Sequence, residues 1–294
     1  MTSKLFRDYL LTVHGENDEV VEITYPLTLE LDISRNNLAE ANTGTFRVYN
    51  LSERKRRILY KDQYNTNEYR YIELRAGYNP EGTIDRKLLP VVFRGNVLVC
   101  QSFRQGVDFI TEIKAYDGGY AISSGFTSRT LGTSVSQKEV INTLMQDLPK
   151  VSIGAIGDYF GGGSRGQVYF GQTKDLLTQI TGGGFYIDNE KAYALKANEC
   201  IQGDVSVISA DTGLLSSPVR SGQQIIFDIV FEPKLSVGQI LELNSQTNKN
   251  FNGIYKVLGF HHKGTISGAT CGYLITSLIL NMGTGLLNLL QEKA

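Results

Sequence analysis

Apolar and polar residues alternate over most of the chain, and turn-forming residues separate the alternating runs. The pattern is clearest between Asp211 and Ile275, where a DTGLLSSP loop precedes four short runs. The runs are QQIIFDIVF, GQILELNS, GIYKVLGFHH and CGYLITSLIL. An apolar spacing near two, with Pro, Gly and Asn at the breaks, is typical of strands joined by tight turns. The pattern predicts an antiparallel sheet that must pack on another element or close on itself.

The first 120 residues alternate in the same way and predict a β-barrel or sandwich. The alternating segments are LFRDYLLTVHG, EVVEITYPLTLELDIS, GTFRVYNLS, YRYIELRAGY, LPVVFRGNVLVCQSFRQG and DFITEIKAYDGG. One helix is predicted within this region, over SERKRRILYK. It begins at Ser52, whose side chain can accept a hydrogen bond from the free amides of a first helical turn.

That helix contains four consecutive cations, Arg54, Lys55, Arg56 and Arg57. Neighbouring residues of a helix point about 100° apart around its axis, so four in a row cannot all face one ligand. We therefore favour a solvated, partner-facing helix over a phosphate site.

Residues 121–200 have a different character. SVSQKEVINTLMQDLP predicts a helix, with Ser136 and Glu139 at capping-box spacing. TKDLLTQITGGG predicts a second helix, which its triple glycine ends. GFYIDNEKAYALK predicts a hairpin with Asp188 and Asn189 at the turn. This part is expected to be a small mixed α/β domain.

The chain is thus expected to be mainly β with a small α/β part. We predict a first β-barrel domain over 1–120, the mixed α/β domain over 121–200 and a second β-barrel domain over 201–280. The remaining residues, 281–294, form a C-terminal amphipathic tail, predicted as a short helix. Its leucines either dock on the chain itself or fit a groove of a neighbouring subunit.

The composition disfavours two classes of partner. Lysine and arginine total 29 against 30 aspartates and glutamates, a net charge of −1. No strong field attracts DNA or an anionic membrane, so we expect no sequence-specific nucleic-acid binding. Thr276, Ser277, Asn281 and several glycines interrupt the most apolar stretch, 273–290. We therefore expect a soluble protein without stable membrane insertion, made in the cytosol.

The histidines give little sign of catalysis or metal binding. The chain has three, His14, His261 and His262. The adjacent pair lies on a predicted strand, where neighbouring side chains point to opposite faces and cannot bind one metal together without a bulge. We expect one ring to be inward and hydrogen-bonded, and the other to be solvated or in an interface.

The cysteines and the glycine-rich loop also give little sign of catalysis or ligand binding. Cys100, Cys200 and Cys271 lie far apart without a CxxC pair, so buried reduced thiols are expected. The loop over 161–166, GGGSRG, lacks the lysine and hydroxyl of a nucleotide-binding loop. We predict no catalytic, cofactor-binding or metal-binding residue and no enzyme activity.

The order of four sequence landmarks resembles one known family. They are ANTGTFRVYNLSERKRRIL at 41–59, SFRQGVDFITEIKAYDGGYA at 102–121, the two helices with their hairpin, and TGLLSSPVRSGQQIIFDIVFEPKLSVGQILELNS with NGIYKVLGFHHKGTISG. Together they are similar to the baseplate hub proteins of long-tailed bacteriophages, the group related to the contractile-tail central hub and to late-control protein D. One departure is Gly264-Thr265, where family members often have Gly-Asp.

The resemblance implies a structural role in the virion tail baseplate, after synthesis in the host cytoplasm. It implies a homotrimer whose subunits each contribute two barrels similar to the tail-tube fold. Such a trimer joins the sixfold tail tube to the threefold central spike, takes part in genome ejection and contacts other baseplate proteins. The tape measure protein is a further candidate partner.

Two rival functions are kept open. A stand-alone β-rich module could bind a glycan or cell-surface ligand through exposed tyrosines. A cell-wall hydrolase, which we favour less, would use Cys271 or His261, although nothing like a nucleophile elbow precedes that cysteine.

Overall fold

A computed structural model of the chain describes residues 6–16, 19–64, 68–162, 165–205, 207–269, 272–283 and 286–292. Its N-terminal part is β structure with one α-helix. The elements are β1 (Arg7–His14), β2 (Val20–Thr24), β3 (Leu29–Asn36), β4 (Asn42–Tyr49), α1 (Glu53–Leu59), β5 (Tyr71–Tyr78), η2 (Pro80–Gly82), η3 (Arg86–Leu88), β6 (Val91–Gln105) and β7 (Asp108–Asp117).

The middle of the chain supplies three further α-helices. Its elements are α2 (Gly119–Ser124), β8 (Phe126–Leu131), α3 (Gln137–Met145), β9 (Ser152–Ile156), β10 (Gln167–Gln172), α4 (Thr173–Thr181), β11 (Phe185–Asp188) and β12 (Lys191–Ala194). The last part is again β structure. It contains β13 (Glu199–Ile201), β14 (Val207–Ser209), β15 (Val219–Ser221), β16 (Gln224–Val230), β17 (Ile240–Asn244), η4 (Lys249–Phe251), β18 (Gly253–Ile266), β19 (Leu274–Asn281) and β20 (Asn288–Leu290).

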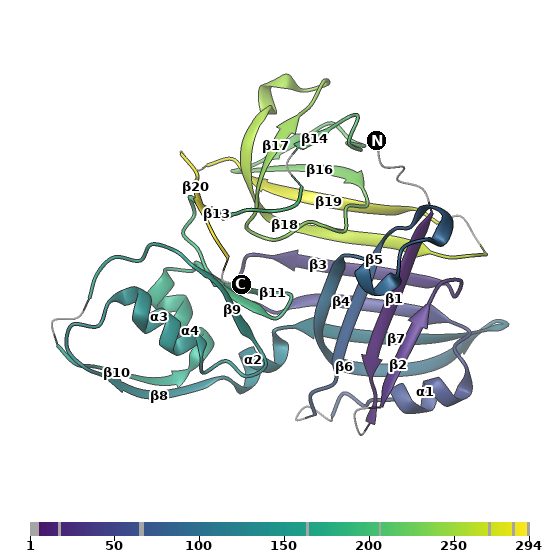
Figure 1. The fold of residues 1–294 in the computed structure, drawn as a ribbon, viewed down its shortest axis with the longest axis horizontal. Coiled ribbons are helices and arrows are strands. Elements are labelled where there is room, and N and C mark those ends of the chain that lie inside the picture. The colour runs from purple at the N-terminus through teal and green to yellow at the C-terminus, as the bar shows by residue number, and fades with distance from the viewer. Residues whose placement is uncertain are drawn as a thin grey trace.

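The mainly β fold predicted from the alternation is confirmed, but its strands join in an unexpected way. One sheet runs in the order β15-β16-β19-β18-β3-β4-β7-β6-β5-β1-β2, with β17 and β14 continuing from β18 to one side. Figure 1 shows β16, β19, β18, β3 and β4 lying one beside the next. Antiparallel pairing of β3 with β18 makes the first and last parts of the chain a single open sheet, not two closed barrels. A separate barrel closes only if its own edge strands pair with each other, and here β3 and β18 pair across the two parts instead.

The sheet contains a repeated five-strand unit. In the first unit, β3 pairs β4, β4 pairs β7, β7 pairs β6 and β6 pairs β5. In the second, β15 pairs β16, β16 pairs β19, β19 pairs β18 and β18 pairs β17. All these pairs are antiparallel. In chain order, the first strand of each unit pairs with the second, the second with the fifth, the fifth with the fourth and the fourth with the third. The chain therefore carries the same strand topology twice.

Three clusters of buried apolar side chains stabilise these parts. The first fills the N-terminal unit around Phe46 and Phe93, and the second fills the C-terminal unit around Phe227 and Phe260. The third lies between α3, α4 and the β11–β12 hairpin. Figure 1 shows this helical part at one side of the sheet. The exact domain limits stay a prediction.

The helix predictions for the middle part are confirmed. Ser136 and Glu139 form the capping box at the start of α3. Gly182, with φ 64°, ends α4 in the left-handed conformation that glycine adopts without strain. The hairpin also forms, but its two turn residues are Asn189 and Glu190, because Asp188 still belongs to β11.

Two local predictions are wrong. Ser52 stands at the start of α1, yet no side-chain hydrogen bond caps this helix. The amphipathic helix predicted over 281–294 is replaced by β20, which pairs in parallel with β13. Pairing satisfies the backbone of this short segment, and Leu290 packs on the second apolar cluster. Among the described residues, no helix is long and apolar enough to cross a membrane.

Candidate functional site

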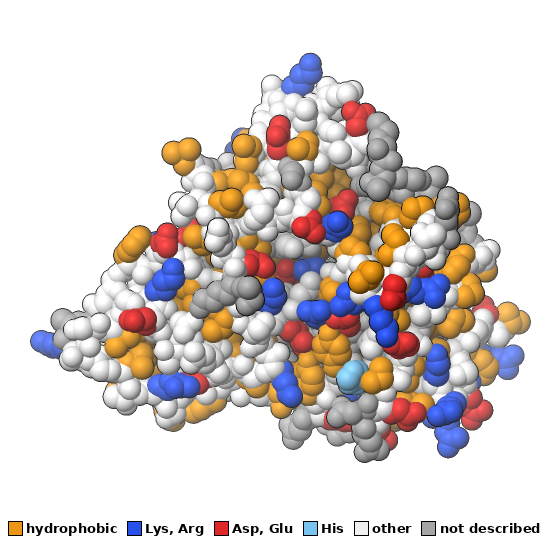
Figure 2. Space-filling model, viewed as in Figure 1, with side chains coloured by type: hydrophobic (Ala, Val, Ile, Leu, Met, Phe, Trp, Pro, Cys, Tyr) orange, Lys and Arg blue, Asp and Glu red, His pale blue; other side chains and the backbone are white. Residues whose placement is uncertain are grey.

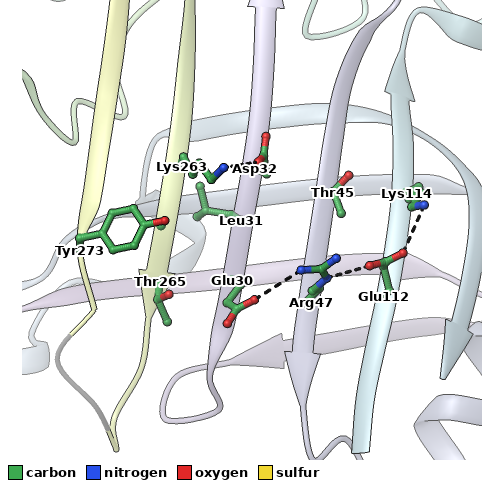
Figure 3. Close-up of a pocket in the computed structure, with 11 residues that line it drawn as sticks. Glu30, Leu31, Asp32, Thr45, Arg47, Glu112, Lys114, Lys263, Thr265 and Tyr273 are labelled. Carbon is green, nitrogen blue, oxygen red and sulfur yellow. Dashed lines mark hydrogen bonds and ion pairs between the residues drawn. The ribbon is translucent and has the colours of Figure 1, made fainter. Parts of the chain in front are cut away.

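The joint between β3 and β18 lies at the centre of a polar face of the main sheet. Alternation turns Leu29, Leu31 and Ile33 of β3 into the core and leaves Glu30 and Asp32 on the opposite face. A shallow hollow of about 440 Å³ lies on this face, shown in Figure 3. The residues that line it are Glu30, Leu31, Asp32, Thr45, Arg47, Glu112, Lys114, Lys263, Gly264, Thr265 and Tyr273.

Across the joint itself, charged groups of the two units contact one another. His261 Nε2 lies 2.7 Å from an oxygen of Asp32, and Lys263 Nζ lies 3.5 Å from the other oxygen. Partial desolvation pushes the pKa of Asp32 upward. The hydrogen bond and charge of His261, aided by the charge of Lys263, outweigh that effect and lower the pKa. Asp32 is therefore ionised at neutral pH.

A second set of charges continues from β3 to β4 and β7. Arg47 Nε donates to Glu112 at 2.7 Å, and Arg47 also approaches Glu30 at 4.0 Å (Figure 3). Lys114 lies 3.3 Å from Glu112. Because these side chains are partly solvated, each pair contributes at most about 1 kcal/mol to stability.

The chemistry of the hollow is that of a balanced charged surface. Its acids are Glu30, Asp32 and Glu112, and its bases are Arg47, Lys114 and Lys263. When His261 is not counted, the three carboxylates balance the three cations and the hollow has no net charge. Figure 2 likewise shows acidic and basic side chains interspersed on the visible face of the molecule. Such a surface provides no strong field to hold a polyanion.

The two neighbouring histidines occupy opposite faces, as predicted. His261 faces outward and contacts Asp32. His262 is buried, and its Nδ1 lies 2.7 Å from Thr276 Oγ1. Burial, with the nearby charge of Arg35, lowers the pKa of His262 well below its usual value. His262 is therefore a neutral core residue, while His14 packs edge-on against Tyr71.

The cysteine predictions divide between described and undescribed residues. Cys100 and Cys200 are buried free thiols, as expected. Burial raises the pKa of Cys100 to about 12 and that of Cys200 to about 11, which makes both unreactive as nucleophiles. Cys271, the candidate nucleophile of the hydrolase alternative, lies outside the described residues. Within the described ranges, no three His, Cys, Asp or Glu side chains come together to hold a metal ion.

The four consecutive cations of α1 do not converge on one ligand. Arg54 lies 3.7 Å from Glu19, and Lys55 Nζ donates to the carbonyl of Glu22. The Arg56 guanidinium stacks over the ring of Phe109 at 4.1 Å. These separate partners agree with the divergence expected around a helix axis.

A buried ion pair, which sequence reasoning missed, attaches the middle part of the chain to the sheet. Arg35 of β3 donates from Nε and Nη2 to the two carboxylate oxygens of Asp188, at 2.7 and 2.6 Å. Its Nη1 donates to the carbonyl of Val92 at 2.9 Å. The Arg35 side chain is 1% exposed and that of Asp188 is 4% exposed. We call this pair the clamp.

A second buried carboxylate holds the hairpin next to the clamp. Asp117, at the end of β7, accepts hydrogen bonds from the backbone amides of Asn189 and Glu190 at 2.6 and 2.7 Å. Burial, followed by the charge of Asp188, raises the pKa of Asp117. Both turn residues have positive φ, which aims their amides at this carboxylate. The hairpin is thus fixed on the sheet from two sides.

The sequence did contain a signal for the clamp. Leu29, Leu31 and Ile33 mark the inward phase of β3, and the next residue in that phase is Arg35. A charged side chain at a core position requires a buried partner. Alternation alone does not identify Asp188, which is 153 positions away.

With this geometry in view, comparison with known families identifies the chain. The family model described as Baseplate hub gp41 matches residues 10–263, which is most of the sequence. The chain belongs to the baseplate hub gp41 family. The resemblance inferred from the four sequence landmarks is thereby confirmed. None of the curated proteins with which the sequence was compared matches it.

Solved structures share the fold of this gp41-family hub protein. The tail protein from Neisseria meningitidis MC58 has a TM-score of 0.55 at 9% identity, over 93% of this chain and 96% of that chain. The 43 kDa tail protein of prophage MuSo2 from Shewanella oneidensis has a TM-score of 0.58 at 7% identity, over 93% and 98%. Such low identities show a common fold alone.

A third solved structure with a similar fold comes from a secretion system. It is the E. coli c3393 protein, described as a component of the type VI secretion system with structural similarity to T4 bacteriophage tail proteins gp27 and gp5. Its TM-score is 0.53 at 7% identity, over 95% of this chain and 78% of that chain.

Proposed function

We propose that this chain is the structural hub of a bacteriophage tail baseplate. Three copies form an adaptor that joins the sixfold tail tube to the threefold central spike. Membership of the baseplate hub gp41 family supports a structural role in the tail. The trimer, the two binding partners and a role without enzyme activity are the parts that we propose.

The repeated five-strand unit is the observation that carries this proposal. Two units of the same topology lie edge to edge within one chain, joined by β3 and β18. Three chains therefore supply six similar units, which suit a hexameric tube ring. The middle part of the chain has no such repeat and keeps threefold symmetry, which suits a trimeric spike.

The polar face of the sheet supports a position around the path of the genome. Its balanced acids and bases at the β3–β18 joint would let DNA pass without being held. We place this face toward the central channel. The clamped middle part faces other baseplate proteins, and the assembled protein resides in the virion tail after synthesis in the host cytoplasm.

Tube assembly tests the adaptor role. Purified hub protein is added to the tail-tube protein encoded by the same phage, and tube growth is followed by light scattering and electron microscopy. We expect the hub to shorten the delay before growth and to occupy one end of each tube. A protein that neither binds tube ends nor alters the delay would contradict the adaptor role.

A further inference from the structure

The two five-strand units correspond residue by residue. The ladder between β6 and β7 shifts register between Val97 and Val99, and the ladder between β18 and β19 shifts between Val257 and Gly259. In the first unit the shift follows the Val97–Ala115 pair, and in the second it follows the Val257–Leu280 pair. Superposing the two shifts pairs each residue of β6 with the residue 160 positions later in β18.

One row of cross-strand partners in each unit shows the correspondence. In the first unit the row is Tyr71, Asn96, Tyr116, Thr43 and Ser34. In the second unit the row is Ile240, Lys256, Asn281, Gln224 and Ser221. Following the rows outward makes Ser221 the counterpart of Ser34, and Val219 the counterpart of Asp32.

The joint inside the chain uses one strand from each unit. Ser34 lies opposite His261, and Asp32 lies opposite Lys263. The counterparts of these two β18 residues in β6 are Gln101 and Phe103. The equivalent pair of strands is β15 and the outer part of β6. These two strands do not pair with each other within one chain.

Both of these strands present exposed edges. In the described structure, β15 pairs only with β16, and beyond Cys100 β6 pairs only with β7. All residues of β15 and all residues from Gln101 to Gln105 are exposed. Among them are two large apolar side chains, Val219 at 62% and Phe103 at 44% exposure. Each edge also carries one arginine, Arg220 in β15 and Arg104 in β6. Strand edges with unpaired backbone groups favour pairing with another strand.

The lengths of the two edges also match. Lys61 occupies the edge of β6 at Cys100 through a backbone bridge, so the free part begins at Gln101. On the other strand, Pro218 precedes Val219 and has no amide to donate. Three residues of β15 therefore face three residues of β6 before the ladder must stop.

We propose that β15 of one copy pairs antiparallel with Gln101–Phe103 of β6 in a neighbouring copy, in the register of β3 on β18. This interface rests on the proposed trimer and specifies how it closes. Val219 then contacts Phe103 at the position where the internal joint has the Asp32–Lys263 ion pair. An apolar pair at that position shields the facing sides of two exposed hydrophobic side chains from water when the chains associate.

Cross-linking tests this contact directly. Val219→Cys and Phe103→Cys are combined in a Cys271→Ser background and treated with a short bis-maleimide. We expect covalent dimers and trimers on a denaturing gel, and none from either single cysteine variant. A link within one chain is excluded, because seven strand spacings of about 4.8 Å separate β15 from β6 in the sheet.

A charge substitution provides the second arm. Val219→Asp is expected to reduce the particle mass about threefold, whereas Val168→Asp, at a valine that is 72% exposed in β10, leaves the mass unchanged. A wild-type trimer that neither cross-links nor responds to Val219→Asp would overturn the interface and leave the proposed hub intact. A monomeric wild-type protein would overturn both.

Discussion

Replacing Arg35 by alanine is expected to lower the free energy of unfolding by about 3–5 kcal/mol, because it leaves the buried Asp188 carboxylate without its cation. The substitution removes both short hydrogen bonds to Asp188 and the bond to the Val92 carbonyl. It also removes the contact of the guanidinium with the Phe260 ring at 4.8 Å. Urea unfolding followed by circular dichroism measures the change.

Two comparisons show whether the orphaned charge causes this loss. Arg47→Ala removes a half-exposed ion pair from the same sheet and should cost at most about 1 kcal/mol. Adding Asp188→Asn to the Arg35→Ala variant removes the unpaired charge and should restore part of the stability. Equal losses for Arg35→Ala and Arg47→Ala would show that the clamp does not stabilise the fold.

Replacing Gly264 by alanine is expected to cost about 2–4 kcal/mol, from backbone strain together with overpacking. Gly264 has φ 147°, a conformation that favours glycine. A Cβ atom there would stand 2.0 Å from the Tyr273 carbonyl oxygen and 2.6 Å from the Leu274 Cα. Both contacts are with backbone atoms of β19 or of the residue before it, so neither can move aside as a flexible side chain would. Thermal unfolding measures the loss.

Gly82→Ala is the matched control. Gly82 also has positive φ, 67°, but a Cβ there would meet nothing within 4 Å. Its substitution should cost only about 1 kcal/mol, the strain of the left-handed conformation. Similar losses at both glycines would contradict the expected clash between a Cβ atom at position 264 and the backbone at Tyr273 and Leu274.

Local features of the fold were predictable because neighbouring residues determine them. The alternation of β3, β16 and β19 reports that one face of each strand is buried. Ser136 and Glu139 lie one helical turn apart and cap α3 without help from the rest of the chain.

Features that depend on distant partners were not predictable in this way. Nothing local to β3 indicates that its edge pairs with β18, more than 220 residues later. The leucines of the C-terminal tail suit a helix, but the free edge of β13 binds this segment as a strand.

The internal repeat was hidden for a related reason. The row Tyr71, Asn96, Tyr116, Thr43 and Ser34 keeps only its serine in the second unit, where the other positions hold Ile240, Lys256, Asn281 and Gln224. Strand topology requires alternation and turns but few particular residues. The repeat is therefore evident from strand pairing and register, not from residue identity.

The particle formed by the purified protein tests the central claim most directly. Native mass measurement and electron microscopy at micromolar concentration are expected to show a mass three times that of the 32.6 kDa chain. Images should show a threefold ring with a central opening bounded by six similar units. A particle with the mass of one chain at the same concentration, and no ring in the images, would contradict the account.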